Sequence, residues 1–284
     1  MNWSLWILEY GYVDRFPASN LFAAQPNEGR RRMPYCFGLA RSAGRTVLID
    51  TGFADPAIHA RLTAKYGSTR WAAPIDVLAR VGVAATEVDT ILLTHNHFDH
   101  AGCVGAFPAA RVWIQEREIA SYRAAAARPA RFEFLTRSCQ ADLPEQLAAR
   151  PATLVDGPAV VAPGLSLRPA HDTHTAGSQL VVVDNEADGT WVFAGDNVYA
   201  YENLDGLRGD GVLAPIAMTT GSATRWLDLA DDMLATVGRD TRRILPFHEA
   251  ALWATFPSAT FADGLHMAEV TLAGGHPGLL PSAA

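Results

Sequence analysis

Residues 94–100 read Thr-His-Asn-His-Phe-Asp-His and follow directly on an apolar run that is typical of a buried strand. Three histidines and an aspartate thus fall within six positions, although only 9 of the 284 residues are histidine. Side chains alternate along an extended chain, so His95, His97 and Asp99 project to one side. His100 then points elsewhere, and one loop serves two neighbouring positions. Imidazoles and carboxylates bind zinc or another first-row ion, so the fold must accommodate a metal centre at a strand end.

A buried turn of hydrogen-bonded histidines is the alternative interpretation of this cluster. Imidazoles so close together repel one another when protonated and need many polar partners when neutral. We therefore favour a metal centre over a purely structural turn.

Four local ligands cannot complete two metal sites, so distant residues must contribute. Candidates stand at the ends of other predicted strands. His171 and His174 both lie in a polar stretch, and at this stage either one can be the ligand. Asp196 and His248 each follow an apolar run, where a buried polar group needs a cation or strong hydrogen-bond donors.

Predicted strands and helices alternate along both halves of the chain, which indicates an α/β protein. The predicted strands cover residues 3–8, 35–41, 46–49, 90–94, 111–114, 166–167, 179–184, 191–194 and 243–245. The predicted helices cover residues 55–66, 75–81, 116–127 and 223–237, and residues 128–150 read as helical and irregular. Residues 16–34 contain proline and glycine and are predicted to form a long loop. Arg30, Arg31 and Arg32 within it are interpreted as a solvated turn, with an anion clamp at a site entrance as the alternative.

The composition excludes several classes of function. With 23 Lys+Arg against 30 Asp+Glu the formal net charge is −7, so we expect no nucleic-acid partner. Three cysteines without a CxxC spacing argue against a disulfide framework and a thiolate zinc site, and favour a reducing compartment. Residues 3–8 lack the basic flank of a signal peptide, and no apolar run is long enough for a membrane span, so we expect a cytoplasmic protein with no membrane partner. Lys65 is the only lysine, which we attribute to a compositional bias of the coding sequence.

The complete pattern resembles the metallo-β-lactamase superfamily, whose signature is His-x-His-x-Asp-His followed by a lone His, a lone Asp and a lone His. The matching residues are His95, His97, Asp99, His100, His174, Asp196 and His248. The resemblance covers residues 35–250. It implies an αββα four-layer sandwich of two mixed β-sheets flanked by helices, in a single domain over residues 1–284. That domain would have two pseudo-repeated halves, roughly 1–125 and 150–284, and a helical insertion at about 116–150.

The resemblance also gives Asp50 a role in orienting a metal-bound histidine. Asp50 stands in the run Asp-Thr-Gly, which also occurs in aspartic proteases. The sequence has no second copy of that run, and the protease mechanism needs two carboxylates, so we set the protease interpretation aside.

Within the superfamily the chain is most similar to N-acyl homoserine lactone lactonases. Residues 95–107 with Gln115 and Glu118 resemble their first block, and residues 196–204 resemble their second, including Tyr199 three positions after Asp196. The same matching makes His174, which opens His-Thr-x-Gly, the ligand in place of His171. The first 34 residues and residues 206–225 match no block of that family.

The resemblance implies two divalent metal ions, with zinc as the expected metal. His95, His97 and His174 would hold one ion, Asp99, His100 and His248 the other, and Asp196 would bridge them. A hydroxide shared by the two ions would attack the carbonyl of a lactone, as in quorum-quenching enzymes. Asp99 would carry the proton to the leaving alkoxide, and Tyr199 would donate a hydrogen bond to the developing oxyanion.

The expected partner is therefore a small-molecule lactone or ester, and a homodimer is compatible with the sequence. The first alternative is another hydrolase on the same scaffold, acting on a thioester as in glyoxalase II, an aryl ester or a phosphoester. The second is an iron-containing flavodiiron-type redox protein. Phe107 and the tryptophans are expected to pack in the core instead of lining an acyl pocket.

Overall fold

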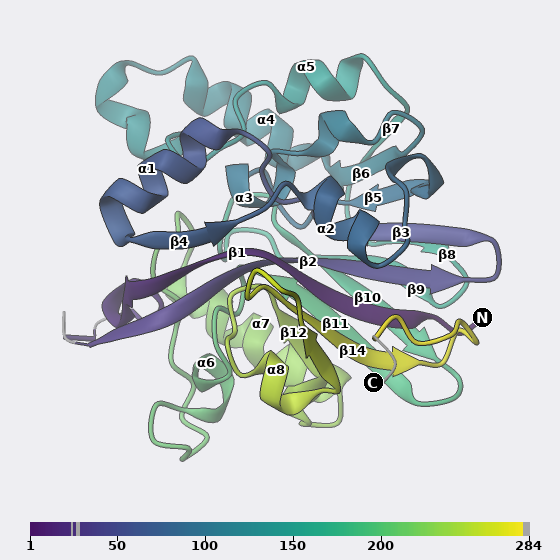
Figure 1. The fold of residues 1–284 in the computed structure, drawn as a ribbon. Helices are drawn as coiled ribbons and strands as arrows, with labels where there is room; N and C mark the ends of the chain where they lie inside the picture. The colour runs from purple at the N-terminus through teal and green to yellow at the C-terminus, as the bar shows by residue number, and fades with distance from the viewer. Residues whose placement is uncertain (24, 27–28, 281–284) are drawn as a thin grey trace.

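Two mixed β-sheets lie face to face in the computed structural model, which describes residues 1–23, 25–26 and 29–280 (Figure 1). The larger sheet has the order β13-β14-β1-β2-β3-β5-β6-β7, and β4 pairs with β1. Its strands are β1 (Ser4–Pro17), β2 (Arg30–Ser42), β3 (Arg45–Ile49), β4 (Ser68–Trp71), β5 (Thr90–Leu92), β6 (Arg111–Gln115), β7 (Ala152–Val155), β13 (Ser258–Thr260) and β14 (His266–Leu272). The strands β3, β5, β6 and β7 run parallel to one another, and the other pairs are antiparallel.

The smaller sheet has the order β12-β11-β10-β9-β8. Its strands are β8 (Ala159–Ala162), β9 (Leu165–Pro169), β10 (Gln179–Asn185), β11 (Gly189–Gly195) and β12 (Ile244–Pro246). Only the pair β11 and β12 is parallel in this sheet.

Helices lie on the outer side of both sheets (Figure 1). Those beside the larger sheet are α1 (Pro56–Tyr66), α2 (Pro74–Arg80), α3 (Phe98–Ala101), α4 (Glu116–Ala126) and α5 (Leu143–Ala148), with the 3₁₀ segment η4 (Ala130–Leu135) between the last two. On the opposite side lie α6 (Glu202–Asp205), α7 (Ala223–Thr236) and α8 (Leu252–Thr255). This arrangement confirms the predicted four-layer α/β sandwich.

The alternation of side chains along the strands produces two hydrophobic cores. Along β1, Leu5 and Ile7 pack into the core between the sheets, whereas Trp6 and Leu8 face the helix layer. Beneath the smaller sheet, α7 buries Trp226 among other apolar residues, and the Trp226 indole N–H donates to the carbonyl of Asn197 at 2.7 Å. Helix α7 thereby fixes the turn that follows β11, which carries Asp196.

The prediction of a long loop at residues 16–34 is wrong at both of its ends. Strand β1 continues to Pro17 and β2 begins at Arg30, and these two residues pair across the hairpin. Each of these two strand ends has its pairing partner close by in the sequence. The proline and glycine residues within 16–34 nevertheless obscured the alternating pattern that is typical of a strand. Residues 24, 27 and 28, which the predicted loop included, lie outside the described residues.

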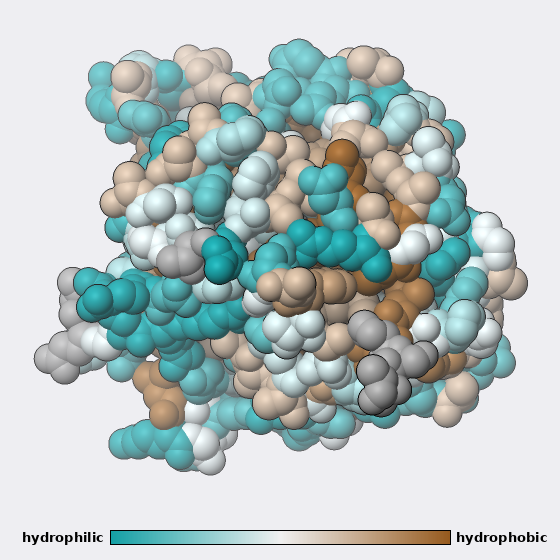
Figure 2. All heavy atoms as spheres, viewed as in Figure 1, coloured by the Kyte–Doolittle hydropathy of each residue, from teal (hydrophilic) through white to brown (hydrophobic). Residues whose placement is uncertain are grey.

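The interpretation of the arginine run as a solvated turn is also wrong. Arg31 pairs with Glu202 at 2.9 Å, and Arg32 pairs with the fully buried Glu9 at 2.6 Å. Hydrophilic residues nevertheless gather over the protruding ends of β1 and β2, at the left of the view in Figure 2. Arg31 and Arg32 thus tie β2 to its neighbours, whereas Arg30 is exposed.

Several strands had no counterpart in the prediction: β4, β7, β8, β13 and β14. The last two come late in the chain and yet join the larger sheet, where β14 pairs with β1. The division into two pseudo-repeated halves with an insertion remains a prediction. Among the described residues, no helix combines the length and apolar character needed to cross a membrane.

Candidate metal centre

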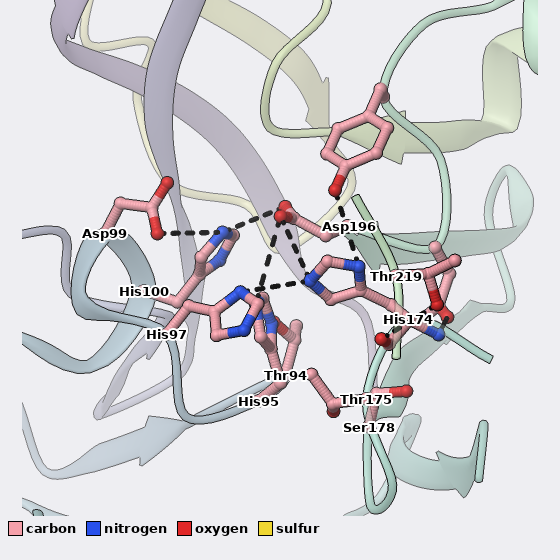
Figure 3. Close-up of polar contacts among 12 residues, drawn as sticks. Thr94, His95, His97, Asp99, His100, His174, Thr175, Ser178, Asp196 and Thr219 are labelled. Carbon is pink, nitrogen blue, oxygen red and sulfur yellow. Dashed lines mark hydrogen bonds and ion pairs between the residues drawn. The ribbon is translucent and has the colours of Figure 1, made fainter. Parts of the chain in front are cut away.

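Seven side chains from four separate segments of the chain converge at one edge of the sandwich, and Figure 3 labels all of them except His248. They form two groups, the first with His95, His97, His174 and Asp196, the second with Asp99, His100 and His248. Within each group the candidate ligand atoms all lie within 4.8 Å of one another. These are the seven residues predicted from the sequence. Their role as metal ligands is taken up under the proposed function.

Asp196 lies between the two groups. Its Oδ2 atom is 3.4 Å from His174 Nε2 and 3.9 Å from His95 Nε2. Its Oδ1 atom is 2.9 Å from His100 Nε2 and 3.1 Å from His248 Nε2. One carboxylate therefore presents one oxygen to each group, which is the geometry that a bridging ligand requires.

Asp99 and His100 lie in the short helix α3, and the other candidate ligands come from loops at the ends of strands. His95 and His97 follow β5, His174 lies between β9 and β10, and His248 follows β12. Asp196 directly follows β11, where Gly195 has a φ of 53°. A Cβ atom on Gly195 would lie 2.6 Å from Thr94 Oγ1, so only glycine lets the two loops approach so closely.

Hydrogen bonds on Nδ1 turn the Nε2 atoms of three histidines toward the centre. His100 Nδ1 is 2.7 Å from Asp50 Oδ2, and His95 Nδ1 is 3.0 Å from Thr94 Oγ1. Asp50 also accepts from the backbone N–H and the hydroxyl of Thr94, each at 2.7 Å, so Thr94 Oγ1 has a lone pair left for His95. His248 Nδ1 donates to the carbonyl of Pro34 at 2.7 Å. Such partners fix the tautomer and the ring orientation of metal-binding histidines.

The electrostatic environment keeps part of the cluster neutral. Burial lowers the pKa of His97 to about 4 and that of His174 to about 3, and it holds the pKa of His95 well below the ordinary value. Burial opposes the charged form of His100 as well, but the carboxylates of Asp196 and Asp50 outweigh it and raise the pKa of His100. Burial likewise opposes the charged form of Asp196, yet the surrounding histidines hold its pKa well below the ordinary range. Neutral imidazoles facing an ionised carboxylate are the protonation states that a metal ion binds.

Buried ligand atoms that lack hydrogen bonds indicate that the cluster fits metal ions. Three buried ligand atoms, His95 Nε2, His100 Nε2 and Asp196 Oδ1, have no hydrogen bond of normal geometry among the described residues, although the last two lie 2.9 Å apart as an ion pair. Buried polar atoms without partners cost free energy, and a divalent cation removes that cost. A set of five imidazoles and two carboxylates without thiolate suits two first-row ions. The donor set therefore fits a dinuclear metal site.

Glu118 ties the two ligand loops together. Its buried carboxylate accepts from the Asn96 N–H at 3.0 Å, from the Thr175 hydroxyl at 2.8 Å and from the Gly177 N–H at 2.7 Å. Sequence reasoning noted Glu118 as part of a block but gave it no role. Thr94 and Pro34 were missed, and no sequence signal marks a carbonyl such as that of Pro34.

A cavity of about 430 Å³ opens over the metal groups. Its lining includes Asp99, Tyr199 and Glu118, together with side chains from β1, β2, α1, α4 and residues 134–139. Tyr199 is buried, and its hydroxyl lies 3.4 Å from His174 Nδ1. Burial, with the nearby Asp196, raises the pKa of Tyr199 well above its usual value.

Two segments that match no sequence block of the lactonases contribute to this cavity. The first 34 residues supply Phe16 and Met33, and residues 206–225 supply Met218 and Thr220. The second segment also holds a ligand loop in place, because the Thr220 N–H and the Thr219 hydroxyl both donate to the His174 carbonyl at 3.0 Å.

Other candidates lie outside the site. His171 is 3.4 Å from Gln115 Oε1 and belongs to neither metal group. Phe107 is buried in the core, and no tryptophan of the described residues lines the cavity. The arginines of residues 30–32 do not line it either, so the anion clamp at the entrance is not where it was suggested.

Residues 32–248 match the Metallo-beta-lactamase superfamily, a span that contains all seven ligand candidates. The chain belongs to that superfamily. A curated N-acyl homoserine lactonase from Bacillus cereus is 28% identical over 184 residues, which make up 60% of this chain and 66%, just under two thirds, of that protein. Among solved structures, a quorum-quenching N-acyl homoserine lactone lactonase aligns with a TM-score of 0.68 and 21% identity, covering 89% of this chain and 95% of that one. A dizinc quorum-quenching lactonase in complex with a product aligns with a TM-score of 0.64 and 16% identity over 93% and 92% of the two chains. At these identities the two structures establish the shared fold.

Proposed function

We propose that this superfamily member is a metal-dependent hydrolase that opens the ester ring of a lactone, with N-acyl homoserine lactones as the reference substrates. The observation that carries the proposal is Asp196, which presents one oxygen to each of two His/Asp groups at the floor of a cavity. The cavity volume of about 430 Å³ suits a small ester. The lactonase from Bacillus cereus and the two lactonases of known structure, to which this chain is similar, support the same choice.

Two divalent cations, which we propose to be zinc, supply Lewis-acid polarisation of the carbonyl and lower the pKa of water when they are bound. The seven residues of the two groups would hold them, with His95, His97 and His174 on one side of Asp196 and Asp99, His100 and His248 on the other. Side chains of this protein carry out the proton transfer and the stabilisation of charge in the proposed reaction.

Asp99 and Tyr199 are the two catalytic side chains in this proposal. Asp99 lines the cavity, and its Oδ2 atom is 3.8 Å from His248 Nε2, so it can take a proton at the centre and pass it to the departing alkoxide. Tyr199 also lines the cavity, and its phenol can donate a hydrogen bond to the carbonyl oxygen as negative charge develops there. The product of the reaction is a hydroxy acid.

The test combines metal analysis with a substrate panel. Purified protein should contain about two equivalents of metal, and γ-lactones should release acid in a pH-stat faster than aryl esters, thioesters or phosphoesters do. Asp196→Asn should lose metal and lactone hydrolysis together, because one carboxylate serves both groups. Preferential cleavage of a thioester, aryl ester or phosphoester would replace lactone opening by another hydrolase activity. Iron-dependent redox activity without hydrolysis of any ester would refute the proposal.

A further inference from the structure

Three positive side chains that have no acidic partner among the described residues line the cavity. They are Arg61 and Lys65 on α1 and Arg137 just after η4, and all three are exposed. None of them forms an ion pair among the described residues, although ten arginines elsewhere do. Lys65 is also the single lysine of the chain. We call these three residues the cationic mouth.

Aromatic side chains hold two members of the cationic mouth at the cavity. Lys65 Nζ lies 4.8 Å from the centre of the Tyr66 ring, and Arg137 Cζ lies 4.5 Å from that of Phe134. Both rings line the same cavity. Cation–π contacts of this kind orient a positive group without neutralising its charge, so the mouth keeps its positive potential.

Apolar side chains line the same cavity as the cationic mouth and the metal groups. Helix α1 buries none of its residues in the core, but Ile58 and Leu62 face the cavity one helical turn apart. Phe134 and Leu135 line it as well. An occupant that reaches from the metal groups to the mouth therefore needs an apolar stretch.

The acidic residues of the cavity do not neutralise the mouth. Asp99, Glu118 and Asp196 are the only carboxylates among its lining residues. Asp99 and Asp196 belong to the metal groups, and Glu118 is occupied by three hydrogen bonds from the ligand loops. No carboxylate of the cavity therefore balances the positive charge of the cationic mouth. An anionic group on a bound molecule can provide that counter-charge.

We propose that the natural substrate carries an anionic group, a carboxylate, at the far end of an apolar tail attached to the lactone or ester. The inference rests on the proposed hydrolase function and specifies its substrate class. The guanidinium groups of Arg61 and Arg137 suit a carboxylate through paired N–H donors, and Lys65 adds a third charge. The lactone end lies at the metal groups, the tail lies along α1 and the carboxylate lies at the mouth.

The test compares two lactones that differ only in the charge of the tail. One is homoserine lactone acylated with adipic acid, which leaves a terminal carboxylate, and the other is its neutral terminal carboxamide. At low salt we expect kcat/KM to favour the carboxylate by about tenfold, since three positive charges attract the tail but are screened by solvent. The preference should shrink as salt is added.

Substitutions then locate the origin of the preference. In the triple variant Arg61→Gln, Lys65→Gln, Arg137→Gln the ratio of the two kcat/KM values should fall to about one. Arg123→Gln is the matched control, because Arg123 is exposed on the neighbouring α4 and does not line the cavity. An unchanged ratio in the triple variant, or a loss of the ratio in the control, would overturn the assignment of the mouth.

A binding measurement separates this inference from the proposed function. The two ring-opened products carry the same carboxylate at the metal end, so calorimetric titration reports the tail alone. We expect the product with the second carboxylate to bind about tenfold more tightly, and the triple variant to lose that difference. If the products show this difference but no lactone is opened, the hydrolase proposal fails and the anion-binding mouth stands. If both lactones are opened at equal rates, or the products bind equally or not at all, the inference about the tail is wrong.

Discussion

Asp50 controls histidines of both metal groups from a single buried carboxylate. It contacts His100 directly and reaches His95 through the hydroxyl of Thr94. Its backbone has a φ of 61°, a left-handed conformation that aspartate and asparagine tolerate better than other residues with a side chain. Asp50 is therefore a positioning residue whose amide variant can keep the fold.

Asp50→Asn should weaken metal retention by about 10- to 100-fold, because partners of this kind set the orientation and basicity of ligand histidines. The measurement is the metal content after dialysis against graded chelator concentrations. Asp89→Asn is the matched control, since Asp89 also accepts from a backbone N–H and a threonine hydroxyl but touches no histidine. Equal metal loss in both variants would show that Asp50 acts through general stability only.

Tyr199→Phe should slow lactone opening by about 10- to 1,000-fold while the metal content stays at the wild-type level. The hydroxyl is the only group removed, and its contact with His174 is on Nδ1, away from the Nε2 atom that faces Asp196. Steady-state rates and metal analysis of the same preparation provide the check. Parallel loss of metal would place Tyr199 among the groups that hold His174.

The histidine-rich run and the polar residues at distant strand ends indicated which side chains meet, and the resemblance to the superfamily decided between His171 and His174. The local run of residues 95–100 is dense in histidine, and the distant members stand at strand ends, where a polar residue is conspicuous. The groups that orient them were harder to find. Pro34 acts through its carbonyl, which every residue possesses, so only the three-dimensional position of β2 reveals its contact with His248.

At the scale of elements, the start of α4 packs in direct backbone contact with the loop before β10. A Cβ atom on Gly177 would lie 2.2 Å from the backbone nitrogen of Glu118. The same approach brings the Gly177 N–H to the Glu118 carboxylate at 2.7 Å. The absence of a side chain at residue 177 therefore sets the distance between the two ligand loops.

Gly177→Ala should lower the free energy of unfolding by about 2 kcal/mol or more, because backbone atoms of α4 must move to admit the methyl group. It should also loosen the metal site, since the loop of His174 moves with residue 177. Denaturant unfolding measures the first effect. Gly105→Ala serves for comparison, because the nearest atom to a Cβ there is 3.5 Å away and is the end of the Gln146 side chain. Similar losses in the two variants would contradict the argument.

A close partner helped some elements to be predicted but did not suffice, because β8 and β13 pair with the strands that follow them and were still missed. The hairpin of β2 and β3 was predicted from its turn, and α7 was predicted as a helix over residues 223–237. Strand β14 was not found, because it pairs with β1 more than 240 positions away, with Ser4 opposite Leu272. A strand at that separation leaves no pairing signal within its own neighbourhood.

At the scale of the whole molecule, one buried carboxylate joins three strands of the larger sheet. Glu9 in β1 is fully buried, pairs with Arg32 of β2 and accepts from the backbone N–H of His266 in β14 at 2.9 Å. Burial raises the pKa of Glu9 from 4.5 to about 7, although the Arg32 guanidinium opposes the shift. The carboxylate is thus held in an environment that favours its protonated form.

The folded protein binds a proton at Glu9 more tightly than the unfolded chain does, so this group stabilises the fold at low pH. Its contribution should be complete below pH 4.5 and lost as the pH rises toward about 7. Relative to Glu9→Gln, the wild-type protein should lose about 2 kcal/mol of unfolding free energy between those limits. Urea unfolding of both proteins across this pH range is the measurement. A difference between the two proteins that does not vary with pH, or that grows in favour of the wild type at high pH, would contradict the assignment.

The pairing of β1 with β14 also bears on how the chain is made. On the ribosome, residues 266–272 leave the exit tunnel after every ligand residue has already emerged. Until then, the edge of β1 that later pairs with β14 has unpaired backbone N–H and C=O groups. Such open strand edges promote incorrect association of nascent chains. Expression at reduced temperature or with chaperones that shield strand edges should therefore raise the yield of this protein more than that of a sandwich whose strands pair in order of synthesis.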